Sequence, residues 1–376
     1  MSDAAGPRAE LVPATVDAVP GGPVPGGPVP GGPVQVDWEL AVRTARRIAP
    51  AGPVLSRQEA ADVVADLREV TVRAEQHVRD VTGLVPPGEP GPATVVDRGG
   101  WARANVDGFR VVLEPLGERL FEGKPPPNRV AAALTGRVAG AQMGAVLGWM
   151  SDKVLGQYEV FLPEQRTGRL VLVAPNIVAT ERSLGVDPAD FRLWVALHEV
   201  THRTQFTAVP WLHGHVRGEV DALLSATHLD DPVQLLRALK DGVVERRPLV
   251  EMLQSPEQRA VLERVTAFMS LLEGHAEHVM DGVGPAVVPS VVEIRERFQA
   301  RRARRTGPVD RLLRKLLGLD LKALQYAEGS VFVRECVDAV GMAGFNRVWE
   351  SPQALPTRQE IREPGGWVRR VHGASA

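Results

Sequence analysis

The stretch His198-Glu199-Val200-Thr201-His202 constrains this chain more than any other, because it lies in an apolar run and carries two histidines four positions apart. On an α-helix, such positions lie about 40° apart around the axis and roughly 6 Å apart along it. The side chains of His198 and His202 can therefore reach one metal ion, for which we expect zinc. Glu199 faces the side of the same site and is placed to take a proton from a water held there.

The residues before this motif predict where its helix begins. Asp187 is suited to the N-cap, and Pro188 is suited to the first helical position. Asp190 falls in the first turn, where a negative charge suits the helix dipole. This context favours a metal-binding helix over the alternative that His198 and His202 are ordinary helix residues.

A catalytic zinc takes three protein ligands and keeps one position open for water. The best candidate for the third ligand is Glu273, which lies in a segment whose apolar residues recur at helical spacing and which, with Glu277, resembles the Glu-x-x-x-Asp/Glu pair of gluzincin metallopeptidases. Glu277, one turn further, is placed to accept a hydrogen bond from the far nitrogen of a ligating histidine. His275 and His278 are competing ligands, for which we favour polar roles beside the site.

Composition excludes several classes of function. The formal net charge of the 376 residues is −2, which argues against nucleic acid as a partner. The one cysteine, Cys336, excludes an internal disulfide framework and fits a cytoplasmic protein, in which we interpret it as a core residue. The chain opens acidic and then becomes rich in proline and glycine, so we expect no secretory signal.

The sequence also predicts how the chain is organised. Pro-Gly-Gly-Pro-Val occurs three times between Pro20 and Val34, so we expect residues 1–35 to form a disordered tail. Residues 36–376 are expected to form one metallohydrolase domain, with 36–215 and 216–376 as its lobes if it divides. Capping residues and apolar stripes predict helices at 37–48 and 57–82.

Glycines recur at every fourth position in the apolar segment from Ala131 to Met150. This spacing can mark a helix-packing face inside a membrane. Arg137 and Gln142 interrupt the run, however, and the uncharged part is too short for a bilayer. We therefore expect no membrane span, but a buried helix packed through its glycines against another helix, with the metal-binding helix as one candidate.

Two extended stretches, 157–162 and 169–174, flank a turn that contains Gly168 and predict a β-hairpin just before the metal-binding helix. The free edge of such a hairpin can hold an extended peptide across the metal through backbone hydrogen bonds. A purely structural hairpin is an equal alternative. The fold class we expect is α+β and predominantly helical.

Three further residues have candidate roles. Tyr326, on a helix expected from Ala323 to Val340, is a candidate for hydrogen bonding to a developing oxyanion. The alternative is a core tyrosine with a purely structural role. His213 and His215 lie in a break after the metal-binding helix, and we interpret them as incidental or substrate-facing rather than as ligands.

Together, these features resemble an actinobacterial zincin-like family with the HExxH motif, whose members are described as zinc-dependent metalloproteases, as hydrolases, or as proteins associated with deazaflavin-coenzyme biosynthesis. The resemblance covers nearly everything after the Pro/Gly-rich tail. The stretches that carry it, besides the metal-binding helix, are Val96–Arg98 with Trp101 and Asn105, Leu147–Trp149, Leu155–Tyr158, Val209–Trp211, Leu272–Glu277, Val279–Asp281, Gln325–Tyr326 and Leu355–Thr357.

The resemblance implies a zincin-like fold with His198, His202 and Glu273 as zinc ligands and Glu199 as general base. From the residues and the resemblance together, we expect a zinc metallopeptidase that cleaves a peptide or amide bond. Two alternatives stay open, namely a catalytically inactive, zinc-stabilised scaffold linked to deazaflavin coenzymes and a hydrolase of a small amide. The sequence indicates neither the substrate nor the oligomeric state.

Overall fold

The computed structural model of the chain describes residues 36–121, 129–162, 168–226, 256–304 and 319–373. The expected tail at 1–35 lies outside these residues. The elements are α1 (Trp38–Ile48), α2 (Arg57–Thr82), β1 (Thr94–Val96), α3 (Arg98–Phe121), α4 (Arg129–Met150), β2 (Gly156–Glu159), β3 (Arg169–Val173), α5 (Ala174–Leu184), α6 (Pro188–Ala208), α7 (Leu212–Ala226), α9 (Pro256–Val283), α10 (Val291–Arg304), α12 (Leu319–Phe345), two 3-10 turns (Asn346–Trp349 and Pro352–Ala354), α13 (Arg358–Arg362) and α14 (Pro364–His372).

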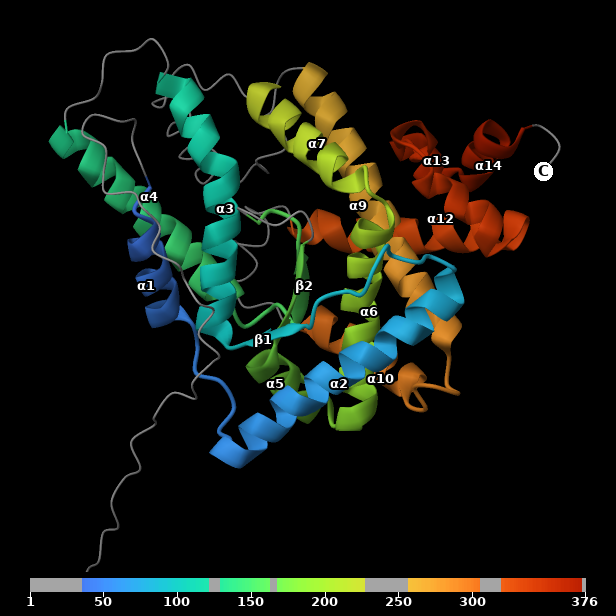
Figure 1. Ribbon diagram of the computed structural model, residues 1–376, viewed down its shortest axis with the longest axis horizontal. Helices are drawn as coiled ribbons and strands as arrows, with labels where there is room; N and C mark the ends of the chain where they lie inside the picture. Colours follow the sequence, from blue (N-terminus) through green and yellow to red (C-terminus); the bar gives the residue numbers. More distant parts are fainter. Residues whose placement is uncertain (1–35, 122–128, 163–167, 227–255, 305–318, 374–376) are drawn as a thin grey trace, which may run out of the picture.

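This architecture is α+β and predominantly helical, as the sequence predicts (Figure 1). The two expected N-terminal helices are confirmed with their caps. Asp37 accepts a hydrogen bond from the backbone N–H of Leu40 at the start of α1. Ser56 and Glu59 form a capping box at the start of α2, and Gly83 ends that helix with a φ of 67°.

A three-stranded sheet with the order β1-β3-β2 lies at the centre of the fold (Figure 1). The predicted hairpin is confirmed as the antiparallel pair β2 and β3, in which Gly156 lies opposite Leu172. The sequence did not predict β1, which runs parallel to β3. Side chains alternate across β3, so Leu172 packs toward α2 and α6, whereas Val171 packs toward α1 and α3.

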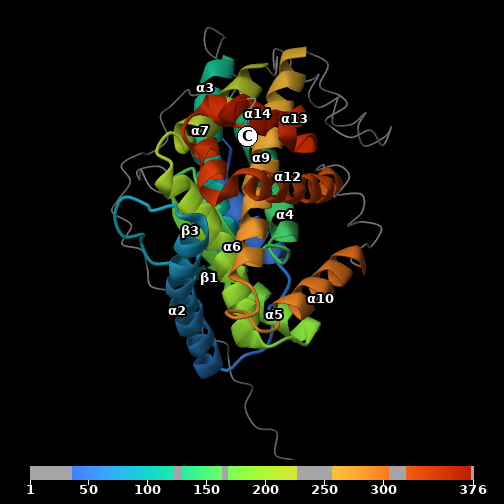
Figure 2. The same cartoon turned by 90° about the vertical axis from the view of Figure 1, so that its right-hand side faces the viewer.

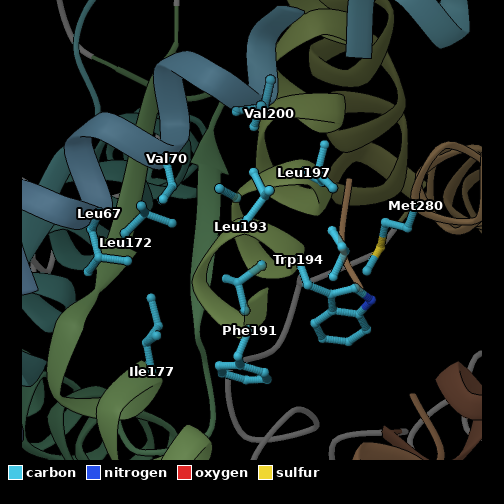
Figure 3. Close-up of a cluster of buried hydrophobic side chains, with 14 of the residues drawn as sticks. Leu67, Val70, Leu172, Ile177, Phe191, Leu193, Trp194, Leu197, Val200 and Met280 are labelled. Carbon is cyan, nitrogen blue, oxygen red and sulfur yellow. The ribbon is translucent and has the colours of Figure 1, made fainter. Parts of the chain in front are cut away.

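The main hydrophobic core lies between the sheet, α2 and α6. Figure 3 shows Leu172 of β3 and Leu193 of α6 gathered beside Val70 of α2. Phe191 and Trp194 lie on either side of Leu193 in the sequence of α6, and their rings stack with centroids 5.9 Å apart. Because α6 is buried along most of its length, the predicted ligands His198 and His202 lie on a tightly packed helix.

The glycine-rich helix α4 packs against α1, not against α6 as one of our expectations held. A Cβ atom at Gly140 would lie 2.3 Å from the carbonyl oxygen of Asp37, and one at Gly144 would lie 2.3 Å from that of Ala41. The matching spacing of four residues in both helices brings the two backbones together. Figure 1 shows the two helices side by side.

The expectation that α4 is buried is also wrong, because much of its surface lies at the outside of the fold. Val130, Leu134 and Val138 are exposed by 77%, 64% and 48%. The glycine face alone makes the close contact with α1. Among the described residues, Val130–Met150 is the one helix that is long and apolar enough to cross a membrane by length and composition, and 22% of its apolar window is buried.

The helices α9 and α12 cross in backbone contact immediately beside a predicted metal ligand (Figure 1 and Figure 2). A Cβ atom at Gly274 would lie 2.2 Å from the carbonyl oxygen of Gly329, and one at Gly329 would lie 1.9 Å from that of Ser270. No side chain larger than hydrogen fits at either position. Since Gly274 directly follows Glu273, this crossing sets the depth of that carboxylate in the fold.

We predict that Gly274→Ala lowers the free energy of unfolding by about 1–3 kcal/mol, because the added methyl group forces two backbones apart. Chemical denaturation measures this change. The control is Gly218→Ala in α7, where nothing lies within 4 Å of an added Cβ atom. That variant should be neutral or gain up to about 1 kcal/mol from helix propensity. Equal destabilisation of the two variants would contradict a tight crossing.

Candidate metal centre

Helix α6, which carries the predicted ligands His198 and His202, begins where the sequence predicts. Asp187 accepts a hydrogen bond at 3.0 Å from the backbone N–H of Asp190, and Pro188 occupies the first helical position. The Asp190 carboxylate also accepts hydrogen bonds from the backbone N–H and the hydroxyl of Ser290, which precedes α10. The start of α6 is therefore anchored from both sides.

Three predicted ligands meet where α6 passes α9. The Nε2 atoms of His198 and His202 lie 3.2 Å apart. The Oε2 atom of Glu273 lies 3.5 Å from the first and 3.6 Å from the second. In the part of the chain that the structure describes, no other group of at least three histidine, cysteine or acidic side chains converges in this way.

These separations fit a zinc ion. Nitrogen and oxygen ligands about 2.1 Å from a tetrahedral zinc lie about 3.4 Å from one another, and the three observed separations bracket that value. The side chains of His198, His202 and Glu273 are 28%, 14% and 14% exposed, so solvent reaches the centre from one side. Two imidazoles and one carboxylate with an open side form the ligand set of a catalytic rather than a structural zinc site.

Glu199 lies beside this centre, and 6% of its surface is exposed. Burial raises the pKa of its carboxyl to about 7, with the His202 side chain lowering it and the Glu273 carboxylate raising it further. A carboxyl group with a pKa near neutrality can both accept and return a proton. This position and environment suit the predicted general base.

Strand β2 passes directly over Glu199. A Cβ atom at Gly156 would lie 2.8 Å from Cγ of Glu199 and 2.9 Å from the carbonyl oxygen of Val171. A glycine is therefore required at this point of β2. Gly156 could not be singled out from the sequence, because its role depends on a contact with a residue more than forty positions away.

The electrostatics of the three ligands agree with a cation site. Burial lowers the pKa of the His202 imidazole, but Glu273, together with Glu199 and Gln205, outweighs burial and raises this pKa to about 9. A positive charge beside Glu273 is thus favoured at this point of the fold, and a metal ion would replace the proton that His202 otherwise carries there.

The far nitrogen of His202 is held by Gln205, a residue that the sequence analysis did not consider. His202 Nδ1 lies 3.0 Å from the Gln205 side-chain oxygen. We had expected Glu277 to hold a ligating histidine. Glu277 is half-buried one turn after Glu273, and such a role toward His198 stays a prediction.

The competing ligands take other positions. His275 is fully buried, and burial lowers the pKa of its imidazole to about 3. It lies against Gln205 rather than in the ligand cluster. His278 is half-buried outside that cluster, and burial lowers the pKa of its imidazole. The expectation that neither ligates the metal agrees with this geometry.

The break that we expected at 210–215 is shorter than predicted, because α7 begins at Leu212. His213 and His215 therefore lie in a helix, not in a loop. The His213 ring packs edge-on against Phe206, with centroids 5.3 Å apart, and the His215 ring packs against Phe268 at 5.6 Å. Neither belongs to the ligand cluster.

Two other candidates have different outcomes. Tyr326 lies in α12, three residues before the crossing at Gly329, but its side chain lies outside the described part of the chain, and its role toward an oxyanion stays a prediction. Cys336 is fully buried, and burial raises the pKa of its thiol to about 12, which agrees with a core residue.

The stretch around Arg98 has a structural role. The Arg98 guanidinium donates to the side-chain oxygen of Asn176 and to the carbonyl oxygens of Pro50 and Ala51. The buried Trp101 donates its indole N–H to the Gln157 side-chain oxygen at 2.8 Å. These contacts join α3 to β2 and to the loops around the sheet, so this stretch supports the centre without forming part of it.

The sequence profile of the zincin-like metallopeptidase family matches residues 36–368. The chain belongs to this family. The match begins where the Pro/Gly-rich segment ends and includes the three ligands and Glu199. No curated protein matches the chain.

A crystal structure described as a "putative hydrolase with a novel fold" from Chloroflexus aurantiacus is similar to this chain, with 32% sequence identity and a TM-score of 0.66. The alignment covers 90% of this chain and 99% of that one. The family and this neighbour together support a zinc metallohydrolase in general.

We predict that the purified protein binds about one zinc ion per chain. Glu273→Ala should lower the zinc affinity by more than about 100-fold, because removing a ligand costs more than removing a residue that only orients a ligand. Metal analysis and competition with a chelator measure both quantities. The control His278→Ala changes a histidine five positions away on α9 and should keep the wild-type affinity. A metal-free wild type, or equal losses in the two variants, would contradict this ligand set.

Proposed function

We propose that this protein is a zinc-dependent metallopeptidase that cleaves a peptide bond in an extended substrate. The observation that carries the proposal is the convergence of His198, His202 and Glu273 within 4.8 Å, with the buried Glu199 beside them. A centre with three protein ligands and an open side is built for hydrolysis rather than for holding the fold together.

In this proposal, His198, His202 and Glu273 hold the zinc ion, which when bound supplies the Lewis acidity that activates water and polarises the substrate carbonyl. Glu199 takes a proton from the attacking water at its carboxylate oxygen. It then returns that proton to the nitrogen of the leaving amine. The cover of Gly156 over Glu199 excludes bulk water from one side of the carboxylate.

The edge strand β2 supports an extended peptide as the substrate. Val173 N–H donates to the Leu155 carbonyl, and hydrogen-bonded pairs alternate along an antiparallel ladder. The backbone groups of Gln157 therefore face β3, whereas those of Gly156 and Tyr158 point to the outer edge. Among the described residues, no strand pairs with that edge. A peptide added there would pass beside Glu199.

A hydrolase of small amides would use the same chemistry but would not need this edge. An inactive scaffold would need neither the open side of the centre nor a buried Glu199 with a raised pKa. A cytoplasmic location and a link with deazaflavin coenzymes remain part of the proposal, resting on the single cysteine and on the sequence resemblance respectively.

We predict that Glu199→Gln keeps about one zinc ion per chain while turnover falls by roughly 10²- to 10⁴-fold, because the amide has the same shape but cannot accept the proton. Zinc content and hydrolysis of a peptide library are measured on the same sample. Turnover that survives the substitution would rule out the role of Glu199. A zinc-loaded wild type without turnover on peptides or amides would favour the scaffold.

We also predict that methylating single backbone nitrogens of a peptide substrate lowers kcat/KM at alternate positions. Each methyl group that faces β2 removes one hydrogen bond, with a net value of about 0.5–1.5 kcal/mol, and so lowers kcat/KM about 2- to 12-fold. Amides that point away from β2 serve as internal controls and should tolerate methylation. Short amides that are hydrolysed as fast as long peptides would indicate a small-amide hydrolase instead.

A further inference from the structure

Gln205 lies on the same side of α6 as the two histidine ligands, three residues after His202. It is fully buried. Its side-chain oxygen lies 3.0 Å from His202 Nδ1. Its side-chain nitrogen lies 3.0 Å from both the carbonyl oxygen of Leu272 and Nδ1 of His275. One amide group thus contacts a ligand on α6 and the backbone just before Glu273 on α9.

The hydrogen-bonding capacity of this group leaves one consistent assignment. If His202 binds a metal through Nε2, its Nδ1 carries a proton and must donate. Gln205 then accepts that bond through its oxygen and directs both N–H bonds toward α9. One goes to the Leu272 carbonyl, and the other goes to His275, whose Nδ1 must accept. Each of these polar groups on Gln205 is satisfied without water.

His275 gives Gln205 a rigid partner. Its ring stacks on Phe345, with centroids 5.7 Å apart and planes 26° apart, and it packs edge-on against Trp349 at 5.4 Å. Because His275 is fully buried between these rings, its Nδ1 atom has one fixed position. The amide plane of Gln205 is therefore fixed from the α9 side before any metal arrives.

From this geometry we propose that Gln205 is the positioning residue of the metal centre, which orients the His202 imidazole for ligation and fixes α6 against α9 at Leu272. The proposal rests on the zinc site of the proposed function. In this arrangement Gln205 contacts neither substrate nor metal, and His275 anchors Gln205.

The test is zinc affinity, measured by competition with a chelator, in two variants of the full-length protein. Gln205→Leu removes the acceptor for His202 and both donors to α9. We expect its zinc affinity to fall about 10- to 100-fold. Gln205→Glu keeps an acceptor oxygen for His202 in a side chain of the same shape. Because this variant also loses the amide donors to Leu272 and His275, we expect its zinc affinity to fall by up to about 10-fold, which is less than in Gln205→Leu.

The matched control is Thr201→Val. Thr201 is also fully buried on α6, and its hydroxyl donates to the Leu197 carbonyl. This variant removes a buried hydrogen bond from the same helix without touching a ligand contact, so its zinc affinity should stay within about twofold of wild type. Thermal denaturation of the metal-free proteins shows whether each variant is folded at the assay temperature.

Several results would overturn the proposal. A loss of zinc affinity in Gln205→Leu that is no larger than in Thr201→Val would mean that the effect is general destabilisation of α6. If Gln205→Leu fails to fold, the decision falls to Gln205→Glu, and a large loss of affinity there would exclude the acceptor role. A wild type that binds no zinc at all would instead refute the proposed function, so the two failures are distinguishable.

Discussion

The metal centre depends on the depth at which α9 lies in the fold, because Glu273 comes from α9 and both histidines come from α6. That depth is set by the backbone contact between Gly274 and Gly329, where α12 crosses α9 without an intervening side chain. Because a close-packed protein interior resists small displacements, a direct contact between two backbones fixes the position of α9 relative to α12. The position of the predicted ligand Glu273 thus depends on Gly274, the residue that follows it.

The opposite side of the centre is built on the same physical basis. Gly156 brings β2 against the Glu199 side chain, so the sheet lies as close to α6 as its backbone allows. Glycines therefore border the site on two sides, one beside the ligand on α9 and one above the base on α6. Between them, Gln205 supplies the polar contact that joins the two ligand-bearing helices.

Local patterns predicted the parts of the site that lie close together in sequence. The spacing of His198 and His202, the Asp187 cap and the hairpin before α6 were all apparent, and the third ligand followed from the chemistry of zinc. Contacts between distant segments could not be predicted. The glycine spacing in α4 indicated a close helix partner, but it did not identify α1, and β1 was too short for a strand pattern. A buried hydrogen-bond partner for Gln205 could have been predicted, because a glutamine one turn beyond a predicted ligand in an apolar helix needs such a partner.

The burial of Glu199 has a consequence for the origin of the proton on the product. A carboxyl group that is 6% exposed has little contact with bulk solvent. In the proposed mechanism, this burial would shield the proton on Glu199 from exchange with buffer until it is transferred. The proton that Glu199 returns to the leaving amine would therefore come from the same water molecule whose oxygen enters the carboxylate product. In isotopic terms, one water molecule would supply a hydrogen to the amine product and its oxygen to the carboxylate product.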